Sequence, residues 1–356
     1  MHAELRPLAE SAAASPPGPA IRVEAPGRLH LGFLDPSATL GRRFGSVGLV
    51  LEDLATEVDL ARLPAGSGDE IVGRPGDAAA VTRAGEHLRA LRLATGHENP
   101  VRLVLRRVLP AHAGFGSGTQ LALAVGHAWS AALGLGLDSA RIAALLGRGV
   151  RSGIGIAGFD QGGLLVDGGP RADGSPAALL SRLALPAAWR VILLLDARLE
   201  GLHGAAERAA LASLPPLPRL VAADICHEVL MHMLPGAAGA EFTPFAAGVS
   251  RVQHLLGRHF AAAQSGSPYA SAAVGRAIGW LAAHAETGAG QSSWGPTGFA
   301  IVASAEGARR VVAAAHAAGV VDPALEVRIV GARNRGGSVA PVPISIPDRA
   351  ANPAGT

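Results

Sequence analysis

The segment Pro110–Gln120, PAHAGFGSGTQ, joins an alternating apolar stretch at residues 101–109 to an amphipathic stretch at residues 119–133. Alternation with a period of two predicts a strand, and apolar residues three and four apart predict a helix. Glycines at positions 114, 116 and 118 let the backbone turn tightly and approach a ligand closely. The segment therefore predicts a strand, a glycine-rich loop and a helix in direct succession.

A loop of this kind favours a phosphate ligand. The first turn of a helix has unpaired backbone N–H groups and a partial positive charge, both of which stabilise an anion. We predict that the loop binds a diphosphate, a triphosphate or a pyrophosphate leaving group through Gly114, Gly116, Ser117, Gly118, Thr119 and Gln120. The alternative is an ordinary glycine-rich turn between a strand and a helix.

The basic residues limit the ways in which this protein could bind a phosphate. All 31 of them are arginine, and the chain contains no lysine. This excludes a Schiff-base lysine and the phosphate-binding pattern Gly-x4-Gly-Lys-Ser/Thr. Arg28, in the glycine-containing segment APGRLHLG at residues 25–32, can pair bidentately with a phosphate. We expect Arg28 and His30 to lie in a loop, with His30 as a weaker catalytic candidate.

The isoelectric point of about 10.2 does not indicate nucleic-acid binding. Between neutral pH and pH 10 only the amino terminus, Cys226 and Tyr269 can lose a proton, so the high value reflects the missing lysine. The arginines are scattered and aromatic residues make up 4% of the chain, which argues against a nucleic-acid site. No uncharged apolar run reaches membrane-spanning length, so we predict no membrane segment. A single cysteine excludes an intramolecular disulfide and fits a cytoplasmic location.

The order of elements predicts an α+β protein with two domains, at residues 20–188 and 189–333. A buried strand at residues 189–197, WRVILLLDA, opens the second domain, and helices dominate residues 205–285. Residues 1–19 and 334–356 are rich in small residues and proline, so we expect flexible tails.

A second glycine-rich stretch, at residues 147–163, ends near Asp160, whose carboxylate could orient a cation or act as a base. The alternative is an aspartate that only forms a turn. Residues 153–158 match Gly-x-Gly-x-x-Gly, but the match follows a predicted helix and precedes a strand. A dinucleotide fingerprint must follow a strand and open a helix, so we do not predict NAD binding.

A third glycine-rich segment, at residues 288–298, carries polar side chains beside an aromatic one. Gln291, Ser292 and Ser293 offer donors next to Trp294, whose face can pack on a planar substrate. The alternative is a polar loop with one anchoring tryptophan. His203, shortly before Glu207 in the segment GLHGAAE, could also face a cleft.

Three glycine-rich segments in this order resemble the GHMP kinase superfamily. Gly118 stands where those kinases usually carry a serine that helps to hold magnesium, and Arg28 stands where several carry lysine. Five separated blocks, the first and last of which lie within these segments, are similar to the β-ribofuranosylaminobenzene 5′-phosphate synthases of methanopterin biosynthesis; the blocks lie at residues 112–120, 158–163, 201–207, 264–269 and 290–296. The similarity spans about residues 21–332.

The resemblance implies a ribosomal-protein-like N-terminal domain and a ferredoxin-like C-terminal domain. It also implies condensation of phosphoribosyl pyrophosphate with 4-aminobenzoate or 4-hydroxybenzoate, releasing pyrophosphate and carbon dioxide, with magnesium as cofactor and a homodimeric assembly. Metal ligands are not predicted. The alternatives are an ATP-dependent small-molecule kinase of the GHMP type and a non-catalytic ligand-binding protein.

The resemblance also assigns roles to the candidate residues. Asp160 matches the superfamily's catalytic aspartate and would orient magnesium or stabilise positive charge on the sugar. Arg28 would contact a phosphate, and residues 291–294 would line the aromatic-acid pocket. We expect Asp160→Asn to lower turnover at least about a hundredfold if Asp160 carries electrostatic work.

Overall fold

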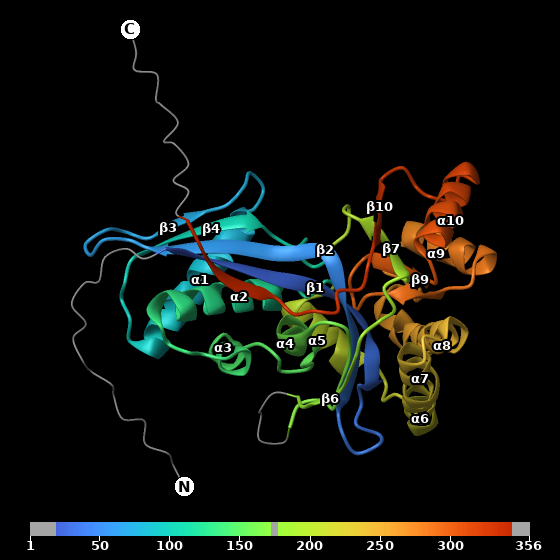
Figure 1. Cartoon of the computed structure of the whole chain (residues 1–356). Helices are drawn as coiled ribbons and strands as arrows, with labels where there is room; N and C mark the ends of the chain where they lie inside the picture. The colour runs from blue at the N-terminus through green and yellow to red at the C-terminus, as the bar shows by residue number, and fades with distance from the viewer. Residues whose placement is uncertain (1–18, 172–176, 344–356) are drawn as a thin grey trace.

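The computed structural model describes residues 19–171 and 177–343. Two β-sheets form its framework, and helices cover them (Figure 1). The predicted α+β class is confirmed. Most of the predicted N-terminal tail, residues 1–18, lies outside the described residues.

The first sheet contains seven strands. Its main path runs β11-β1-β2-β4-β3, while β5 pairs with both β2 and β6. Neighbouring strands are antiparallel except for β3 and β4, which are parallel. The strands are β1 Ala20–Asp35, β2 Phe44–Arg62, β3 Glu70–Val72, β4 Val101–Arg107, β5 Leu164–Asp167, β6 Leu179–Leu183 and β11 Ser338–Val342.

Strand β1 carries two of the predicted site residues. We expected a loop here, and this was wrong, because Arg28 and His30 lie within one long strand paired with β2. The register between the two strands shifts between Pro26 and Arg28 and again between His30 and Gly32. Such irregularities bend a strand and change the direction of its side chains. The chain thus keeps the strand while breaking its regular alternation around Arg28 and His30.

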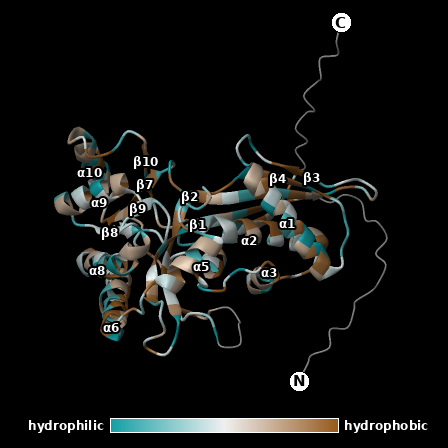
Figure 2. Cartoon of the chain, turned by 180° about the vertical axis from the view of Figure 1, so that it is seen from behind, coloured by the Kyte–Doolittle hydropathy of each residue, from teal (hydrophilic) through white to brown (hydrophobic). Residues whose placement is uncertain are grey.

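Helices α1 and α2 pack on the first sheet, and α2 was predicted. Hydrophobic and hydrophilic residues are mixed along them, as in helices that bury one side (Figure 2). The helices of this part are α1 Ala78–Thr95, α2 Ser117–Leu133, α3 Ser139–Leu145 and α4 Ile154–Gln161. Helix α4 corrects the prediction of a glycine-rich loop: burial of Ile154, Ile156 and Phe159 stabilises a helix despite its glycines, so Asp160 lies in a helical turn.

The second sheet is antiparallel with strand order β10-β7-β9-β8. Its strands are β7 Arg190–Asp196, β8 Gly288–Gln291, β9 Thr297–Val302 and β10 Leu325–Val330. The accompanying helices are α5 Gly204–Ser213, α6 Arg219–Glu228, a π-helix at Val229–Met233, α7 Leu234–Ala238, α8 Phe242–Phe260, a 3-10 turn at Ala261–Ala263, α9 Ala272–His284 and α10 Ala305–Ala317. The third glycine-rich segment is therefore a hairpin with a tight turn rather than a loop.

One hydrophobic core joins the two sheets. It combines Leu31 and Leu49 of the first sheet with Leu193 and Phe299 of the second, and Phe245 of α8 packs among them. The chain changes sheet between β6 and β7, next to the boundary predicted near residue 188. The C-terminal prediction was wrong for residues 334–343, because β11 pairs with β1 along the edge of the first sheet. Residues 344–356 lie outside the described part.

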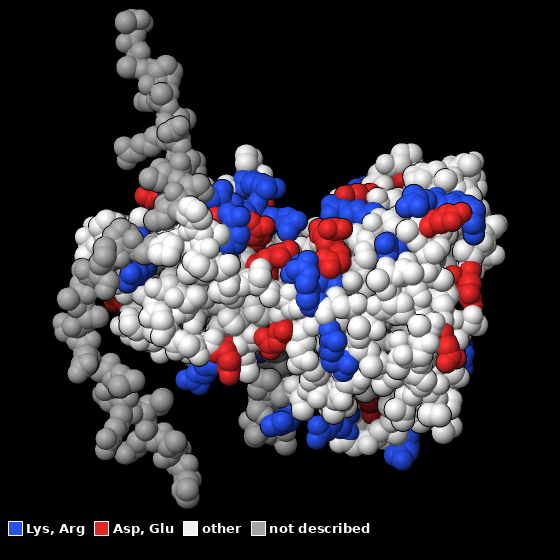
Figure 3. Space-filling view, viewed as in Figure 1, with Lys and Arg blue, Asp and Glu red and all other residues white. Residues whose placement is uncertain are grey.

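Charged side chains on the face drawn in Figure 3 are intermixed, with arginines beside carboxylates around the junction of the two halves. On the outer part of the first sheet, Arg22 pairs with Asp59 at 2.7 Å and Arg333 pairs with Glu24 at 2.9 Å. In the described ranges, every helix is too short or too polar to cross a bilayer.

Candidate active site

The glycine-rich loop after β4 leads into α2 as predicted. Gly114 and Gly116 have φ values of 93° and 74°, a region that strongly favours glycine. Gly116 is the N-cap of α2, and its carbonyl accepts from the N–H groups of Thr119 and Gln120. Within the described residues no side chain caps this helix, so the N–H groups of Ser117 and Gly118 stay available to a ligand.

Arg28 lies directly beside this helix start. Its Nη1 donates to the carbonyl of Gly114 at 2.7 Å, and its backbone N–H donates to Phe115 at 3.1 Å. A Cβ atom on Gly116 would lie 3.2 Å from the Arg28 guanidinium carbon, so glycine permits this approach. Desolvation lowers the pKa of Arg28 to about 10, against which the Glu207 carboxylate raises it. The guanidinium remains cationic at neutral pH, and its buried Nε has no partner in the described part of the chain.

The turn between β8 and β9 closes over the loop. Ser292 Oγ donates to the Gly114 carbonyl at 2.8 Å and accepts from the His30 N–H at 3.0 Å. A Cβ on Gly114 would stand 2.4 Å from the Ser292 carbonyl oxygen, which leaves space only for glycine. The three segments that the sequence singled out around Arg28, Gly114 and Ser292 therefore meet in one place.

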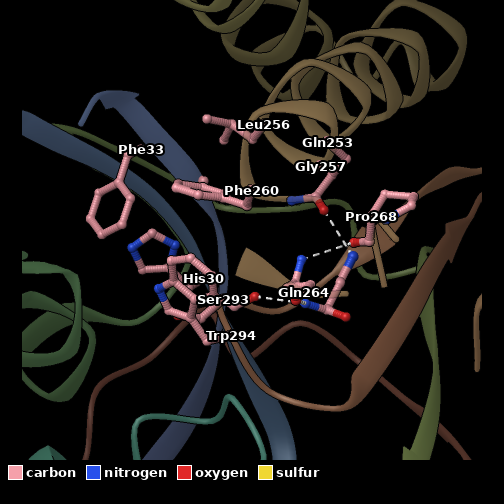
Figure 4. A pocket seen from close by; sticks show the side chains of 12 residues that line it. His30, Phe33, Gln253, Leu256, Gly257, Phe260, Gln264, Pro268, Ser293 and Trp294 are labelled. Carbon is pink, nitrogen blue, oxygen red and sulfur yellow. Dashed lines mark hydrogen bonds between the residues drawn. The ribbon is translucent and has the colours of Figure 1, made fainter. Parts of the chain in front are cut away.

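An aromatic pocket opens next to His30. Its cavity volume is about 40 Å³, and the rest of the space between its walls is open to solvent. The rings of His30, Phe33, Phe260 and Trp294 gather on one side, and glutamine amides lie on the other (Figure 4). Phe260 and Trp294 have ring centroids 4.7 Å apart. The described residues that line the pocket include neither a carboxylate nor a guanidinium, so it suits a planar aromatic molecule.

The amides hold the pocket wall in place. Gln291 Nε2 donates to Gln264 Oε1 at 2.8 Å, and Gln291 N–H donates to Gln253 Oε1 at 2.8 Å. Gln253 Nε2 in turn donates to the Leu31 carbonyl on β1. Of the predicted pocket residues, Gln291, Ser293 and Trp294 line this space. Ser292 instead joins the glycine-rich loop to β1.

His30 stands between the pocket and the phosphate loop. It is 4% exposed, and its Nε2 has no hydrogen-bond partner in the described structure. Burial lowers the pKa of His30 well below its usual range, and the positive charges of Arg28 and Arg151 lower it further. The ring is therefore neutral at pH 7.

Three further arginines near the site were not identified from the sequence, and two of them, Arg83 and Arg148, adjoin the start of α2. They are Arg83 on α1 and Arg148 and Arg151 before α4. Of these, Arg151 pairs with Glu207 of α5 at 2.6 Å. A Cβ on Gly118 would lie 3.3 Å from Arg148 Nη1 and 3.9 Å from Arg83 Nη1. The missing serine side chain at this position thus leaves space for guanidinium groups, and the absence of lysine was the only sequence signal that pointed to arginine.

The segment before α5 covers the loop from the other side. Gly201 N–H donates to the His112 carbonyl at 3.1 Å, and a Cβ on Gly201 would lie 2.5 Å from the Trp294 carbonyl oxygen. The rings of His112 and His203 stack with centroids 3.5 Å apart. His203 thus reaches the rim of the site, as the sequence suggested, while Glu207 was missed as the partner of Arg151.

Comparison with known proteins identifies the family. A β-ribofuranosylphenol 5′-phosphate synthase of Archaeoglobus fulgidus is 33% identical over 247 residues, which are 66% of this chain and 76% of that protein. The chain belongs to the β-ribofuranosylphenol 5′-phosphate synthase family. The synthase of Methanothermobacter thermautotrophicus is 27% identical over 332 residues, covering 88% of this chain and 97% of the relative.

The synthase family shares its fold with GHMP kinases. Residues 79–163 match the GHMP kinases N terminal domain. Lactococcus lactis galactokinase in complex with galactose has a TM-score of 0.64 at 13% identity, covering 90% of this chain and 95% of the galactokinase. A structure described as MDDEF in complex with MVAPP, AMPPCP and magnesium gives 0.62 at 14% identity, covering 91% of this chain and 99% of MDDEF. The two-sheet GHMP-type fold expected from the resemblance is confirmed.

Asp160 does not lie at the phosphate loop in this member of the synthase family. It is exposed in the last turn of α4, where its carboxylate accepts from Ser139 Oγ at 2.5 Å. Ser139 Oγ also bonds His127 Nε2 at 2.8 Å. The α4 residue beside the loop is Gly155, whose carbonyl accepts from the Gln120 amide. The predicted catalytic role of Asp160 stays a prediction, and the contacts observed here give it a role in joining α2, α3 and α4.

The described part of the site provides few side chains that could bind a magnesium ion. Across the described ranges, no three histidine, cysteine or carboxylate side chains form a metal-binding group. The nearby Glu207 carboxylate is already paired with Arg151. Magnesium is commonly held by one or two carboxylates together with substrate phosphates. The described residues therefore supply no group of three or more such ligands here, and the phosphates of a substrate would have to provide most of the ligands of a magnesium ion.

Proposed function

We propose that the protein condenses phosphoribosyl pyrophosphate with 4-hydroxybenzoate, or its 4-amino analogue, to a β-ribofuranosyl-arene 5′-phosphate in methanopterin biosynthesis. Pyrophosphate and carbon dioxide are the other products. The observation that carries the proposal is the junction at His30, where an uncharged aromatic pocket meets a cationic phosphate loop. The relatives are named for a phenol product, which favours the hydroxy acid.

Each half of the site suits one substrate. The rings of Phe260 and Trp294 can pack against the aromatic acid. The N-terminus of α2 and Arg28 can bind the pyrophosphate of the sugar substrate. With both bound, the sugar C1 lies beside His30, in line between the ring carbon and the leaving group. This alignment provides the positioning that the reaction requires.

The chemistry needs no net proton transfer. The C1–O bond breaks and its electron pair leaves on pyrophosphate, so positive charge develops on the sugar. The ring carbon that bears the carboxylate donates a π-electron pair to C1. The bond to the carboxylate carbon then breaks, its electron pair restores the aromatic ring, and carbon dioxide departs. Arg28 stabilises the charge on the leaving group, and neutral His30 adds no positive charge beside C1.

Magnesium enters this proposal only as an ion carried by the substrate. Bound to phosphate oxygens, it would neutralise part of their charge. The arginines would neutralise the rest. A homodimer remains our prediction from the family resemblance.

Incubation with magnesium, phosphoribosyl pyrophosphate and carboxyl-labelled 4-hydroxybenzoate tests the function. The expected result is labelled carbon dioxide and pyrophosphate in equal amounts, with an aryl riboside phosphate detected by mass spectrometry. A parallel reaction with the 4-amino acid measures the preference between the two aromatic acids. If neither product forms and ADP appears from ATP and a small-molecule acceptor, the protein is a kinase and the synthase proposal is wrong.

A further inference from the structure

Two arginines lie at the start of α2 without a carboxylate partner. Arg83 comes from α1 and Arg148 from the turn after α3, and both guanidinium groups approach Gly118, the second residue of α2. Neither guanidinium forms an ion pair or a hydrogen bond within the described ranges of the chain. The buried Nε of Arg148 is among the atoms without a partner.

This arrangement concentrates positive charge. Burial lowers the pKa of Arg148, and the neighbouring charge of Arg83 lowers it further. The N-terminus of α2 adds a partial positive charge at the same place. Like charges gathered without a counter-charge raise the free energy of the empty site, and a bound anion would remove this cost.

A buried histidine gives a second, independent indication of a ligand. His87 lies one turn along α1 from Arg83, is 6% exposed, and its Nε2 has no partner in the described structure. Burial, followed by the charges of Arg148 and Arg83, lowers its pKa to about 4. The neutral ring therefore leaves a buried nitrogen without a hydrogen-bond partner beside two cations. With its proton on Nε2, the ring could donate a hydrogen bond to a phosphate oxygen.

The groups also have a definite order. From the aromatic pocket the chain of contacts runs through His30 and Arg28 to Gly116, and from there along the helix start to Gly118 and the arginine pair. In the proposed reaction C1 lies at the pocket end of this series. A leaving group attached to C1 then extends along the helix start toward Arg83 and Arg148.

We propose that Arg83 and Arg148, with the N–H groups of Ser117 and Gly118, bind the terminal phosphate of the departing pyrophosphate, while Arg28 binds the phosphate attached to C1. This inference rests on the proposed function. As the C1–O bond breaks, the electron pair moves onto pyrophosphate, and the two guanidinium groups stabilise its terminal charge.

Calorimetric titration with inorganic pyrophosphate and magnesium tests the arginine pair. Arg83→Gln and Arg148→Gln should each weaken pyrophosphate binding about tenfold, and the double variant more, since each removes charged hydrogen bonds. Arg89→Gln, at an exposed position on the same helix, is the matched control and should bind as the unaltered protein does. Affinity for 4-hydroxybenzoate should stay unchanged in every variant, and circular dichroism verifies folding.

A titration with ribose 5-phosphate separates the two anionic ends of the sugar substrate. If the double variant loses affinity for ribose 5-phosphate but keeps it for pyrophosphate, the pair binds the other phosphate and the proposal is overturned. Unchanged pyrophosphate binding also overturns it, whether or not the protein makes carbon dioxide. Weakened pyrophosphate binding in a protein without synthase activity supports the arginine pair and contradicts only the proposed reaction.

Discussion

Arginines occur in two contrasting settings in this protein. On the first sheet, Arg22 and Arg106 both pair with Asp59, and Arg333 pairs with Glu24. Around the start of α2, Arg83 and Arg148 have no ion pair among the described residues, and the Glu207 carboxylate, whose charge also acts on Arg28, is paired with Arg151. Arginine charges are thus paired with carboxylates on the first sheet, whereas those of Arg83 and Arg148 are not paired within the described residues.

The difference separates stability from binding. A paired arginine already has its counter-charge, so its removal disturbs the folded structure and leaves a carboxylate behind. Arginines at a helix N-terminus without carboxylates are arranged for an anion that arrives from solution. Charge balance therefore distinguishes structural arginines from functional ones in a chain where every basic residue is an arginine.

The largest expected effect follows from Arg28→Gln. Loss of a guanidinium beside the departing phosphate should lower kcat/KM about a hundredfold to a thousandfold. Thermal unfolding should change little, because among the described residues the guanidinium hydrogen-bonds one backbone carbonyl, that of Gly114, and the backbone bond to Phe115 remains. Arg106→Gln on the sheet is the control and should keep its kinetics. Equal kinetic losses in the two variants would remove the distinction between the two sets of arginines.

The pH dependence of the unfolding free energy tests the surroundings of His87, which lies near Arg83 and Arg148. Its pKa of about 4 lies below the unfolded value of about 6.5. Between these values the unfolded state binds more protons, so stability falls as pH falls, by up to about 3 kcal/mol from this group. His87→Gln should flatten the dependence of the unfolding free energy on pH between 6.5 and 4, as measured by urea denaturation. His316→Gln, at an exposed position on α10, should leave the slope as it is.

Glu24→Gln tests the arginines of the first sheet that are paired with carboxylates. Arg333 has only 2% side-chain exposure, so removal of its carboxylate partner leaves a buried charge. Because Glu24 retains partial contact with water, we expect a loss of about 2 kcal/mol in unfolding free energy, below the range for a fully buried pair. Pyrophosphate affinity should not change. Glu326→Gln, in an exposed pair with Arg328, should change stability by less than about 1 kcal/mol.

Asp160→Asn should have the smallest effect. The sequence alone predicted a loss of at least about a hundredfold for an electrostatic role. The observed hydrogen bond from Ser139, which the asparagine oxygen can also accept, instead predicts a change in kcat/KM within about threefold. Steady-state kinetics separate the two expectations. A hundredfold loss of kcat with an unchanged melting temperature would show that Asp160 takes part in the reaction.

The sequence predicted the elements better than it predicted the surroundings of the site. The glycine-rich turn at Gly114 and Gly116 and the helix after it follow from local glycine conformations and local periodicity, and both are confirmed, although α2 already begins at Ser117. The strand around Arg28 and helix α4 were taken for loops, because their glycines suggested turns. Pairing with β2 stabilises the strand, and burial of Ile154 stabilises α4, by more than their glycines destabilise them. Neither interaction can be read from a short window of sequence.

By itself, the sequence determined the chemistry available to this protein: without lysine, phosphate binding falls to arginine and backbone N–H groups, and its motifs indicated the family. Only the tertiary structure decided which arginines take part. Arg28, Arg83 and Arg148 are far apart in the chain and meet because β1, α1 and the segment after α3 pack around the start of α2. Charge balance depends on distances through space, and those distances are set by the packing of helices on the sheet.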